Sequence, residues 1–432
     1  MGLSKRVLLT PSFGLLCGFV LASGYALFSL DYIELDLSMP TMLYILAGIV
    51  TFIVVASFID TYIKSRVGWS RQVVLSRRST APQASNKIVY DKFVLIAFLV
   101  VQVFIIYSYR NFYFRVTGLR IFSEAIYAYR NSVMFGNGQE VRSIASYILY
   151  LRRFCVASGY VFSYKLIHGI IYKYKERRIL LIGNIVLCAL NNVMAGSRGP
   201  LIFYIIAIIV QAYFVLGSSR NWKNFINTKI VFRTMVVIVI VVGSFEMLGG
   251  LLGRGIAKTL GDYLAVYVSA PLKNLDTYVK EGQFNYALAD NQTLYYLRRF
   301  IANTLHITSW QGAVPHVLRY NSHGYGLGNV YTMFKDFIHD GGVLGVVFYS
   351  ALMALISELL FRKAIREKNS KEKINISIII YSYLFPSIAM SFFSNKFYET
   401  LFDTLFVFYF IVWLLHIMYL QRIKIAINKP KG

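Results

Sequence analysis

The amino-acid sequence predicts an all-α integral membrane protein that crosses the bilayer about ten times. Of its 432 residues, 57% are hydrophobic and only 15% are charged, whereas about a quarter of an average soluble domain is charged. The hydrophobic residues also gather in uncharged runs of about 20 residues, the length that a helix needs to cross a bilayer. Together these observations predict one polytopic membrane domain over residues 1–432.

About ten runs fit that length, and we expect one spanning helix from each. They are Val7–Leu30, Met39–Ile59, Phe93–Tyr109, Phe154–Ile171, Ile179–Ser197, Gly199–Ser219, Thr234–Gly253, Gly341–Ser357, Ile374–Asn395 and Thr404–Gln421. No small-residue cleavage site follows a short apolar stretch in the first run, so we expect it to stay as a helix. Arg152 and Arg153 break the apolar segment before the fourth span. Because adjacent arginines are costly at a bilayer centre, we expect them at its outer boundary.

The basic residues follow the loops on one side of the predicted bundle. An even number of spans places both termini on that side, and short loops rich in lysine and arginine face the cytoplasm. The basic segments are Lys5 and Arg6, Lys64–Lys92, Lys173–Arg178, Arg220–Arg233, Arg362–Lys373 and Arg422–Lys431. This distribution accounts for most of the net charge of +25 without a nucleic-acid partner.

Two of the opposite, outward loops are longer than a connection requires. They cover residues 108–142 and 254–336, and long ordered loops tend to be functional. Within the second loop, Leu294, Leu297, Ile301 and Leu305 repeat at helical spacing. That pattern predicts amphipathic helices lying on the membrane surface.

Arginine dominates the outward loops, and Arg198 is the most informative of them. It separates the uncharged runs Ile179–Ser197 and Gly199–Ser219, so its guanidinium is predicted at a membrane boundary. The planar fork of arginine binds phosphate oxygens bidentately, which favours an outer cleft for a lipid-linked diphosphate. The predicted diphosphate-binding residues are Arg198, Arg254, Arg152, Arg153 and Arg319. The alternative is that such arginines contact lipid headgroups or acidic residues such as Glu124, Glu140 and Asp262.

A glycine-rich segment from His323 to Thr332 is the second candidate region. Glycine allows a backbone to approach a ligand closely, and Tyr325 and Asn329 in this segment are predicted to contact substrate. The spacing matches neither a phosphate-binding P-loop nor a dinucleotide fingerprint.

His323 is the first candidate for a general base, because the ordinary pKa of histidine lies near the operating pH. Asp340 and Glu246 are predicted alternatives, and Glu246 is notable as an ionisable group inside the seventh predicted span. His306 and His316 are further rivals. No outward cluster has metal-ligand spacing, although Asp336, His339 and Asp340 come nearest, so neither a metal nor another cofactor is expected.

Two short stretches resemble the Wzy family of bacterial O-antigen and capsule repeat-unit polymerases. The first is Gly196-Ser197-Arg198-Gly199 followed by Pro200, and the second is Gly328–Thr332 with Asp340-Gly341-Gly342 and Leu344-Gly345 after it. The resemblance implies a GT-C-like glycosyltransferase of the inner membrane, with its site facing the periplasm. It further implies that a sugar hydroxyl of one undecaprenyl-diphosphate-linked unit attacks the anomeric carbon of the growing glycan and undecaprenyl diphosphate leaves. A chain-length regulator and a flippase are the expected protein partners.

Two other functions stay open from the sequence. A flippase or transporter usually places ionisable residues near helix midpoints around a central path, whereas the predicted helix centres here are nearly free of charge. An O-antigen ligase uses the same donor and leaving group with a different acceptor, and the sequence does not separate it from a polymerase.

Overall fold

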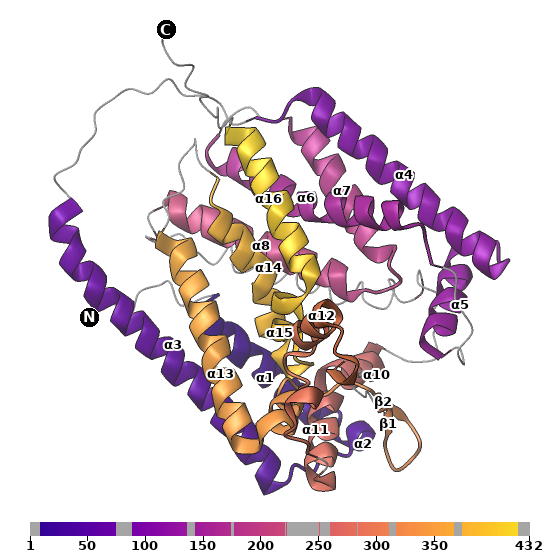
Figure 1. Cartoon of the computed structure of the whole chain (residues 1–432), viewed down its shortest axis with the longest axis vertical. Helices are drawn as coiled ribbons and strands as arrows, with labels where there is room; N and C mark the ends of the chain where they lie inside the picture. The colour runs from indigo at the N-terminus through magenta and orange to yellow at the C-terminus, as the bar shows by residue number, and fades with distance from the viewer. Residues whose placement is uncertain are drawn as a thin grey trace. The chain divides into compact units, whose positions relative to one another are not determined.

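The computed structural model describes residues 9–74, 89–135, 143–173, 177–220, 222, 250, 260–282, 284–310, 317–366 and 374–421. Within these residues the chain is helical apart from loops and one two-stranded hairpin (Figure 1). It forms two compact units. The first comprises Met1–Ser79, Ile226–Lys363 and Tyr381–Phe406, and the second comprises Thr80–Phe225, Ala364–Ile380 and Val407–Gly432.

The elements divide between these units as follows. The first unit holds α1 (Pro11–Phe28), α2 (Leu30–Ile33), α3 (Met39–Val74), α10 (Leu260–Leu264), α11 (Ala270–Glu281), α12 (Tyr295–Leu305), β1 (Arg319–Tyr320), β2 (Gly326–Gly328), nearly all of α13 (Phe334–Arg366) and α15 (Lys396–Phe402). The second holds α4 (Lys92–Thr117), α5 (Phe122–Phe135), α6 (Ser146–Ile171), α7 (Arg178–Val193) and α8 (Gly199–Ser219). Both α14 (Ile376–Ala389) and α16 (Thr404–Gln421) contribute residues to each unit. Short helical turns at η1 (Ala265–Ser269), η2 (Leu288–Asp290), η3 (Thr308–Trp310) and η4 (Met390–Phe392) complete the set.

Seven helices in the described part of the chain are long and apolar enough to cross a membrane: α1, the first part of α3, α4, α6, α8, α13 and α16. Two shorter apolar helices, α7 and Ile376–Phe392, coincide with two more predicted spans. The prediction of an all-α, multi-pass membrane protein is therefore confirmed. The predicted span Thr234–Gly253 lies outside the described residues except for Gly250.

Helix α3 carries a stripe of exposed apolar side chains on one face. Leu43, Leu46, Val50, Val54 and Phe58 recur every three or four residues, and each is at least 55% exposed. A continuous apolar stripe of this kind is unfavourable in water, because soluble proteins rarely expose large apolar patches. The stripe suits contact with lipid chains.

Helices α4 and α6 extend beyond the predicted limits of their spans, as α3 and α13 also do. Helix α4 continues past Tyr109 to Thr117 and ends where Gly118, at φ +72°, donates its N–H to Phe114, as glycine commonly does at helix C-termini. Helix α6 begins at Ser146 and runs through Arg152 and Arg153 without a break. The backbone of α6 is regular at both arginines, and their side chains make the contacts described below.

Helix α13 contains a kink at the predicted start of the eighth span. Gly341 and Gly342 leave the helical conformation, and Gly342 has φ +56°, which favours glycine. A Cβ atom at Gly345 would lie 2.2 Å from the carbonyl oxygen of Phe337, so the two sides of the kink approach closely. The kink separates a short polar segment, residues 334–340, from the apolar remainder.

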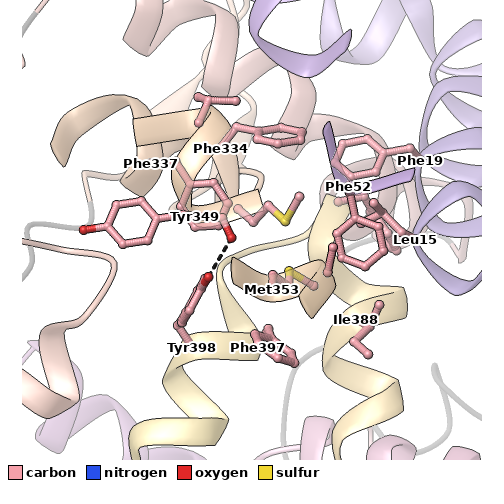
Figure 2. Packing of buried hydrophobic residues seen from close by; sticks show 14 of the residues in the cluster. Leu15, Phe19, Phe52, Phe334, Phe337, Tyr349, Met353, Ile388, Phe397 and Tyr398 are labelled. Carbon is pink, nitrogen blue, oxygen red and sulfur yellow. Dashed lines mark hydrogen bonds between the residues drawn. The ribbon is translucent and has the colours of Figure 1, made fainter. Parts of the chain in front are cut away.

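An aromatic core holds that polar segment in place in the first unit (Figure 2). Phe334 and Phe337 of α13 pack with Phe19 of α1, while Tyr398 of α15 donates a hydrogen bond of 2.6 Å to the carbonyl of Tyr349. A Cβ at Gly48 of α3 would lie 2.1 Å from the Phe334 ring, so the missing side chain makes room for it. The start of α13 is thereby fixed between α1, α3 and α15.

Polar bonds between apolar helices hold the second unit together. The Gln102 side chain of α4 donates to Asn184 of α7 at 2.8 Å, and Ser163 of α6 donates to Gln211 of α8 at 2.7 Å. Hydrogen bonds between buried side chains are a recurring means of joining helices inside a membrane.

Candidate functional site

The turn between α7 and α8 is the first candidate region, and it lies in the second unit. Gly196 has φ +73°, which lets the chain reverse, and Arg198 is the N-cap residue of α8 with Pro200 in the first turn. Arg198 is buried with 3% of its surface exposed. The structure thus places this arginine at the end of an apolar helix, as the sequence predicted.

Two more arginines reach the same stretch of chain from other helices. Arg130 of α5 donates from Nη1 to the carbonyl of Gly196 at 2.9 Å, and Arg152 of α6 donates from Nη1 to the carbonyl of Asn191 at 3.3 Å. The Arg152 guanidinium also lies 5.7 Å from the centre of the Tyr109 ring. We call Arg130, Arg152 and Arg198 the arginine cluster.

Arg153 takes a different direction from its neighbour. Its guanidinium lies 5.5 Å from the centre of the Tyr150 ring on the same helix. Successive residues project about 100° apart around a helix, so adjacent arginines cannot share one contact. Of the two predicted residues, the structure brings Arg152 to the α7–α8 turn.

The arginine cluster suits an anion. Three guanidinium groups supply planar donors, and the first backbone N–H groups of a 21-residue helix add the positive end of its dipole. The Tyr113 hydroxyl donates to the carbonyl of Met194 at 2.5 Å and fixes the turn. Donors held in fixed positions stabilise negative charge that develops near them.

In the first unit, the glycine-rich segment forms the β1–β2 hairpin, with His323 and Gly324 at its tip (Figure 1). The Asn321 side-chain oxygen accepts from the backbone N–H groups of His323 and Tyr325 and shapes the turn. This hairpin was not expected from the sequence, because its two strands are only two and three residues long.

The hairpin tip contacts the residues that follow α1. The His323 side chain is 70% exposed, and its Nε2 lies 3.7 Å from Oε1 of Glu34. Ser322 donates to the same carboxylate from its hydroxyl and its backbone N–H, and these hydrogen bonds lower the pKa of Glu34. The Tyr325 ring stacks on Tyr32 at 5.7 Å. The predicted residues His323 and Tyr325 therefore lie together on an accessible surface.

Arg319 pairs with a carboxylate that the sequence did not suggest. It makes a two-pronged ion pair with Glu281, and its Nε donates to the Tyr331 hydroxyl at 3.0 Å. The hydrogen bonds to Glu281 raise the pKa of Arg319. The Arg319 guanidinium therefore links the Glu281 carboxylate to the Tyr331 hydroxyl.

Asp340 uses both of its carboxylate oxygens on backbone donors. Oδ1 accepts from the N–H of Gln292 at 2.8 Å, and Oδ2 accepts from the N–H of Thr293 at 2.8 Å. This arrangement ties the loop before α12 to the end of the polar segment of α13.

The neighbouring side chains of the polar segment each have a separate partner. Lys335 hydrogen-bonds to Gln292 and lies 3.5 Å from Asp336, whose Oδ2 accepts from Asn395 at 3.1 Å. His339 hydrogen-bonds through Nδ1 to the Tyr278 hydroxyl at 2.7 Å. Among the described residues, no group of three histidine, cysteine, aspartate or glutamate side chains is arranged to hold a metal ion.

A cavity of about 190 Å³ opens beside this polar segment, and we call it the α13 pocket. Its lining residues all belong to the first unit: Asn329, Val330, Tyr331, Thr332, Lys335, Asp336, Ser394, Asn395, Lys396 and Glu399. Asn329 is the one predicted site residue that lines it. The sequence signal that the prediction missed is the group of polar residues at the end of the predicted span Ile374–Asn395 and directly after it: Ser394, Asn395, Lys396 and Glu399.

Two predicted residues, Arg254 and Glu246, lie outside the described residues.

No protein family, curated protein or solved structure matches this chain.

Proposed function

We propose that this chain is a glycosyltransferase that polymerises undecaprenyl-diphosphate-linked oligosaccharide units at the outer face of a bacterial cytoplasmic membrane, with both termini in the cytoplasm. The observation that carries the proposal is the arginine cluster, in which Arg130 of α5 and Arg152 of α6 donate to carbonyls of the stretch 191–196, directly before Arg198 at the start of α8. The Wzy resemblance of the residues around Arg198 supports the same assignment.

The proposed reaction requires cations that stabilise the negative charge of the departing diphosphate, and the arginine cluster supplies them. A sugar hydroxyl of one unit forms a bond to the anomeric carbon of another, and the bond from that carbon to the diphosphate breaks. The electron pair leaves with the diphosphate, which gains negative charge, and the hydroxyl proton passes to a base. Fixed guanidinium groups stabilise the charged transition state more than the ground state, which accelerates the reaction.

The structure informs the choice of that base. Asp340 has both oxygens occupied by backbone donors, whereas His323 is exposed and has Glu34 nearby. A neutral histidine can accept a proton near neutral pH, and a carboxylate at its side stabilises the imidazolium that forms. Of these two residues of the first unit, His323 therefore remains the proposed base.

Reconstitution tests the proposal. Purified protein is incubated with a synthetic undecaprenyl-diphosphate repeat unit, and a ladder of products is expected. Arg198→Ala and Arg152→Ala should each slow ladder formation about a hundredfold or more, the usual cost of losing one donor to a developing charge. Arg198→Lys should recover only part of the rate, because lysine keeps the charge without the planar fork.

The matched control is Arg120→Ala, which removes an exposed arginine of the same unit. It should polymerise at the wild-type rate. A wild-type rate for well-folded Arg198→Ala would contradict the proposal. Transfer only to a lipid A core acceptor would indicate a ligase, and lipid translocation without any glycosyl transfer would indicate a flippase.

A further inference from the structure

The α13 pocket has the size of one six-membered ring. Its volume of about 190 Å³ holds about six waters at the volume of liquid water, and a cavity of about 150 Å³ accommodates benzene. A disaccharide or a lipid diphosphate exceeds this space. A larger glycan could therefore place only about one of its rings inside the pocket.

The charged side chains of the pocket compensate one another. Lys396 forms an ion pair with Glu399, and Lys335 lies 3.5 Å from Asp336. Burial raises the pKa of Glu399, while Lys396 acts in the opposite direction. With two lysines matched by two acidic residues, the pocket has no excess of positive charge with which to attract phosphate.

The pocket lining contains both hydrogen-bond donors and acceptors. Lysine supplies only donors, a carboxylate supplies only acceptors, and the side-chain amide of Asn329 supplies both. A hydroxyl group also donates and accepts, so a ring bearing several hydroxyls can bond to this mixture in more than one place. An apolar ring would displace water from these groups without replacing its hydrogen bonds, which costs binding free energy.

The wall of the pocket also holds more polar atoms than its internal bonds use. Among the described residues, Oγ of Ser394 and Oδ1 of Asn395 are buried without a hydrogen-bond partner, whereas Nδ2 of Asn395 donates to Thr293 and Asp336. Buried polar groups are nearly always paired in stable proteins, and exceptions concentrate where function requires them. Both atoms lie behind the surface, so a ligand would reach them only if the wall moved.

We infer that the α13 pocket is a binding subsite for one uncharged sugar ring, which donates to Asp336, accepts from Lys335 and hydrogen-bonds with the Asn329 amide. That this ring belongs to a lipid-linked repeat unit rests on the proposed function. The capacity of the pocket to bind a free sugar does not depend on the proposed function.

Saturation-transfer NMR on the purified full chain tests the inference. The probes are the methyl glycosides of glucose, galactose, mannose and N-acetylglucosamine, with glycerol and inorganic phosphate as comparison ligands. At least one glycoside should bind, and phosphate should not displace it. Asn329→Ala should weaken that binding about three- to tenfold, the effect of one or two lost hydrogen bonds, because no internal bond of the Asn329 side chain is described.

Asp336→Asn provides the second variant and Asn303→Ala the control. Asp336→Asn keeps the shape of the side chain but leaves Lys335 without its carboxylate, so phosphate should begin to compete with the glycoside. Asn303 is exposed on α12 outside the pocket lining, and its replacement should change nothing. The inference is overturned if no glycoside binds better than glycerol, if Asn329→Ala binds like the wild type, or if phosphate competes in the wild type.

The two proposals fail separately. Glycoside binding that depends on Asn329 without any ladder would defeat the polymerase assignment and leave the subsite intact. A ladder formed by the wild type, with no effect of Asn329→Ala on the acceptor KM or on glycoside binding, would defeat the subsite and leave the polymerase assignment intact.

Discussion

Substitution of Asp340 distinguishes a structural anchor from a catalytic base. Its two oxygens accept from the backbone N–H groups of Gln292 and Thr293, each at 2.8 Å. A hydrogen bond to a charged group contributes about 1.5–3 kcal/mol. Asp340→Ala removes both acceptors and should cost about 3–6 kcal/mol of unfolding free energy. Asp340→Asn keeps one acceptor and should cost about half of that.

Unfolding of the detergent-solubilised protein, followed by tryptophan fluorescence, measures these differences. The control is Asp31→Asn, because Asp31 is an exposed residue of the same unit with no described hydrogen bond. Its unfolding free energy should stay within about 0.5 kcal/mol of the wild type. Glycoside binding to the α13 pocket should weaken in Asp340→Ala, since the loop that holds Gln292 against Lys335 loses its anchor.

One result would refute this reasoning. If Asp340→Asn unfolds like the wild type and yet abolishes polymerisation, the carboxylate acts on the substrate, and its contacts to the backbone are incidental.

Two further predictions concern the packing of α1 and the hairpin tip. A Cβ at Gly18 would lie 2.2 Å from the carbonyl oxygen of Ala389, so Gly18→Ala should destabilise the protein by about 1–3 kcal/mol. Gly24→Ala on the same helix meets nothing within 4 Å and should be neutral or slightly stabilising in the same unfolding measurement; equal costs would contradict the packing argument. Hydrogen bonds from Ser322 lower the pKa of Glu34 in the folded protein. They therefore stabilise the hairpin tip fully above the unfolded pKa of glutamate, about 4.3. This stabilisation is lost as the pH falls through the lower pKa of the folded protein. Amide exchange of Ser322, corrected for its intrinsic pH dependence, should therefore stay slow from pH 7 to about pH 5 and accelerate only below about pH 4. Loss of protection already at about pH 6, or the same acid response in Glu34→Gln, would show that another group controls the tip.

Spanning helices were predictable from the sequence because length and apolar composition are local properties. The limits of α8 and α16 agree with the predicted runs Gly199–Ser219 and Thr404–Gln421. The kink in α13 was not predicted as such, although its glycines stand at the expected start of a span. A pair of glycines is compatible with a helix or a turn, and the packing around it decides which one forms.

The α13 pocket was not predictable by the same means. Its two lining segments, residues 329–336 and 394–399, are far apart in the sequence and meet because α13 packs against α15 in the aromatic core. Each segment alone has an ordinary mixture of polar residues. Only their juxtaposition makes a cavity.

The partners of the arginines were not predictable from the sequence. Arg319 was grouped with Arg198 in the prediction because both are outward arginines, but Arg319 pairs with Glu281. Arg130 was not singled out, and it reaches the α7–α8 turn only because α5 lies beside that turn. A sequence identifies the cation, whereas the fold decides which acceptor it meets.

The two candidate regions differ in charge, and that difference matches the two parts of a lipid-linked sugar. Arg130 and Arg152 donate to the stretch of chain directly before Arg198, and this concentration of cations favours the diphosphate and makes its binding sensitive to ionic strength. In the α13 pocket Lys335 and Lys396 have acidic neighbours, so hydrogen bonds rather than net charge select the ligand. A diphosphate gains nothing from the balanced pocket, and a neutral sugar gains little from a cluster of cations. Each region therefore selects a different chemistry by itself: the arginine cluster favours phosphate, and the α13 pocket favours a neutral ring that bears hydroxyl groups.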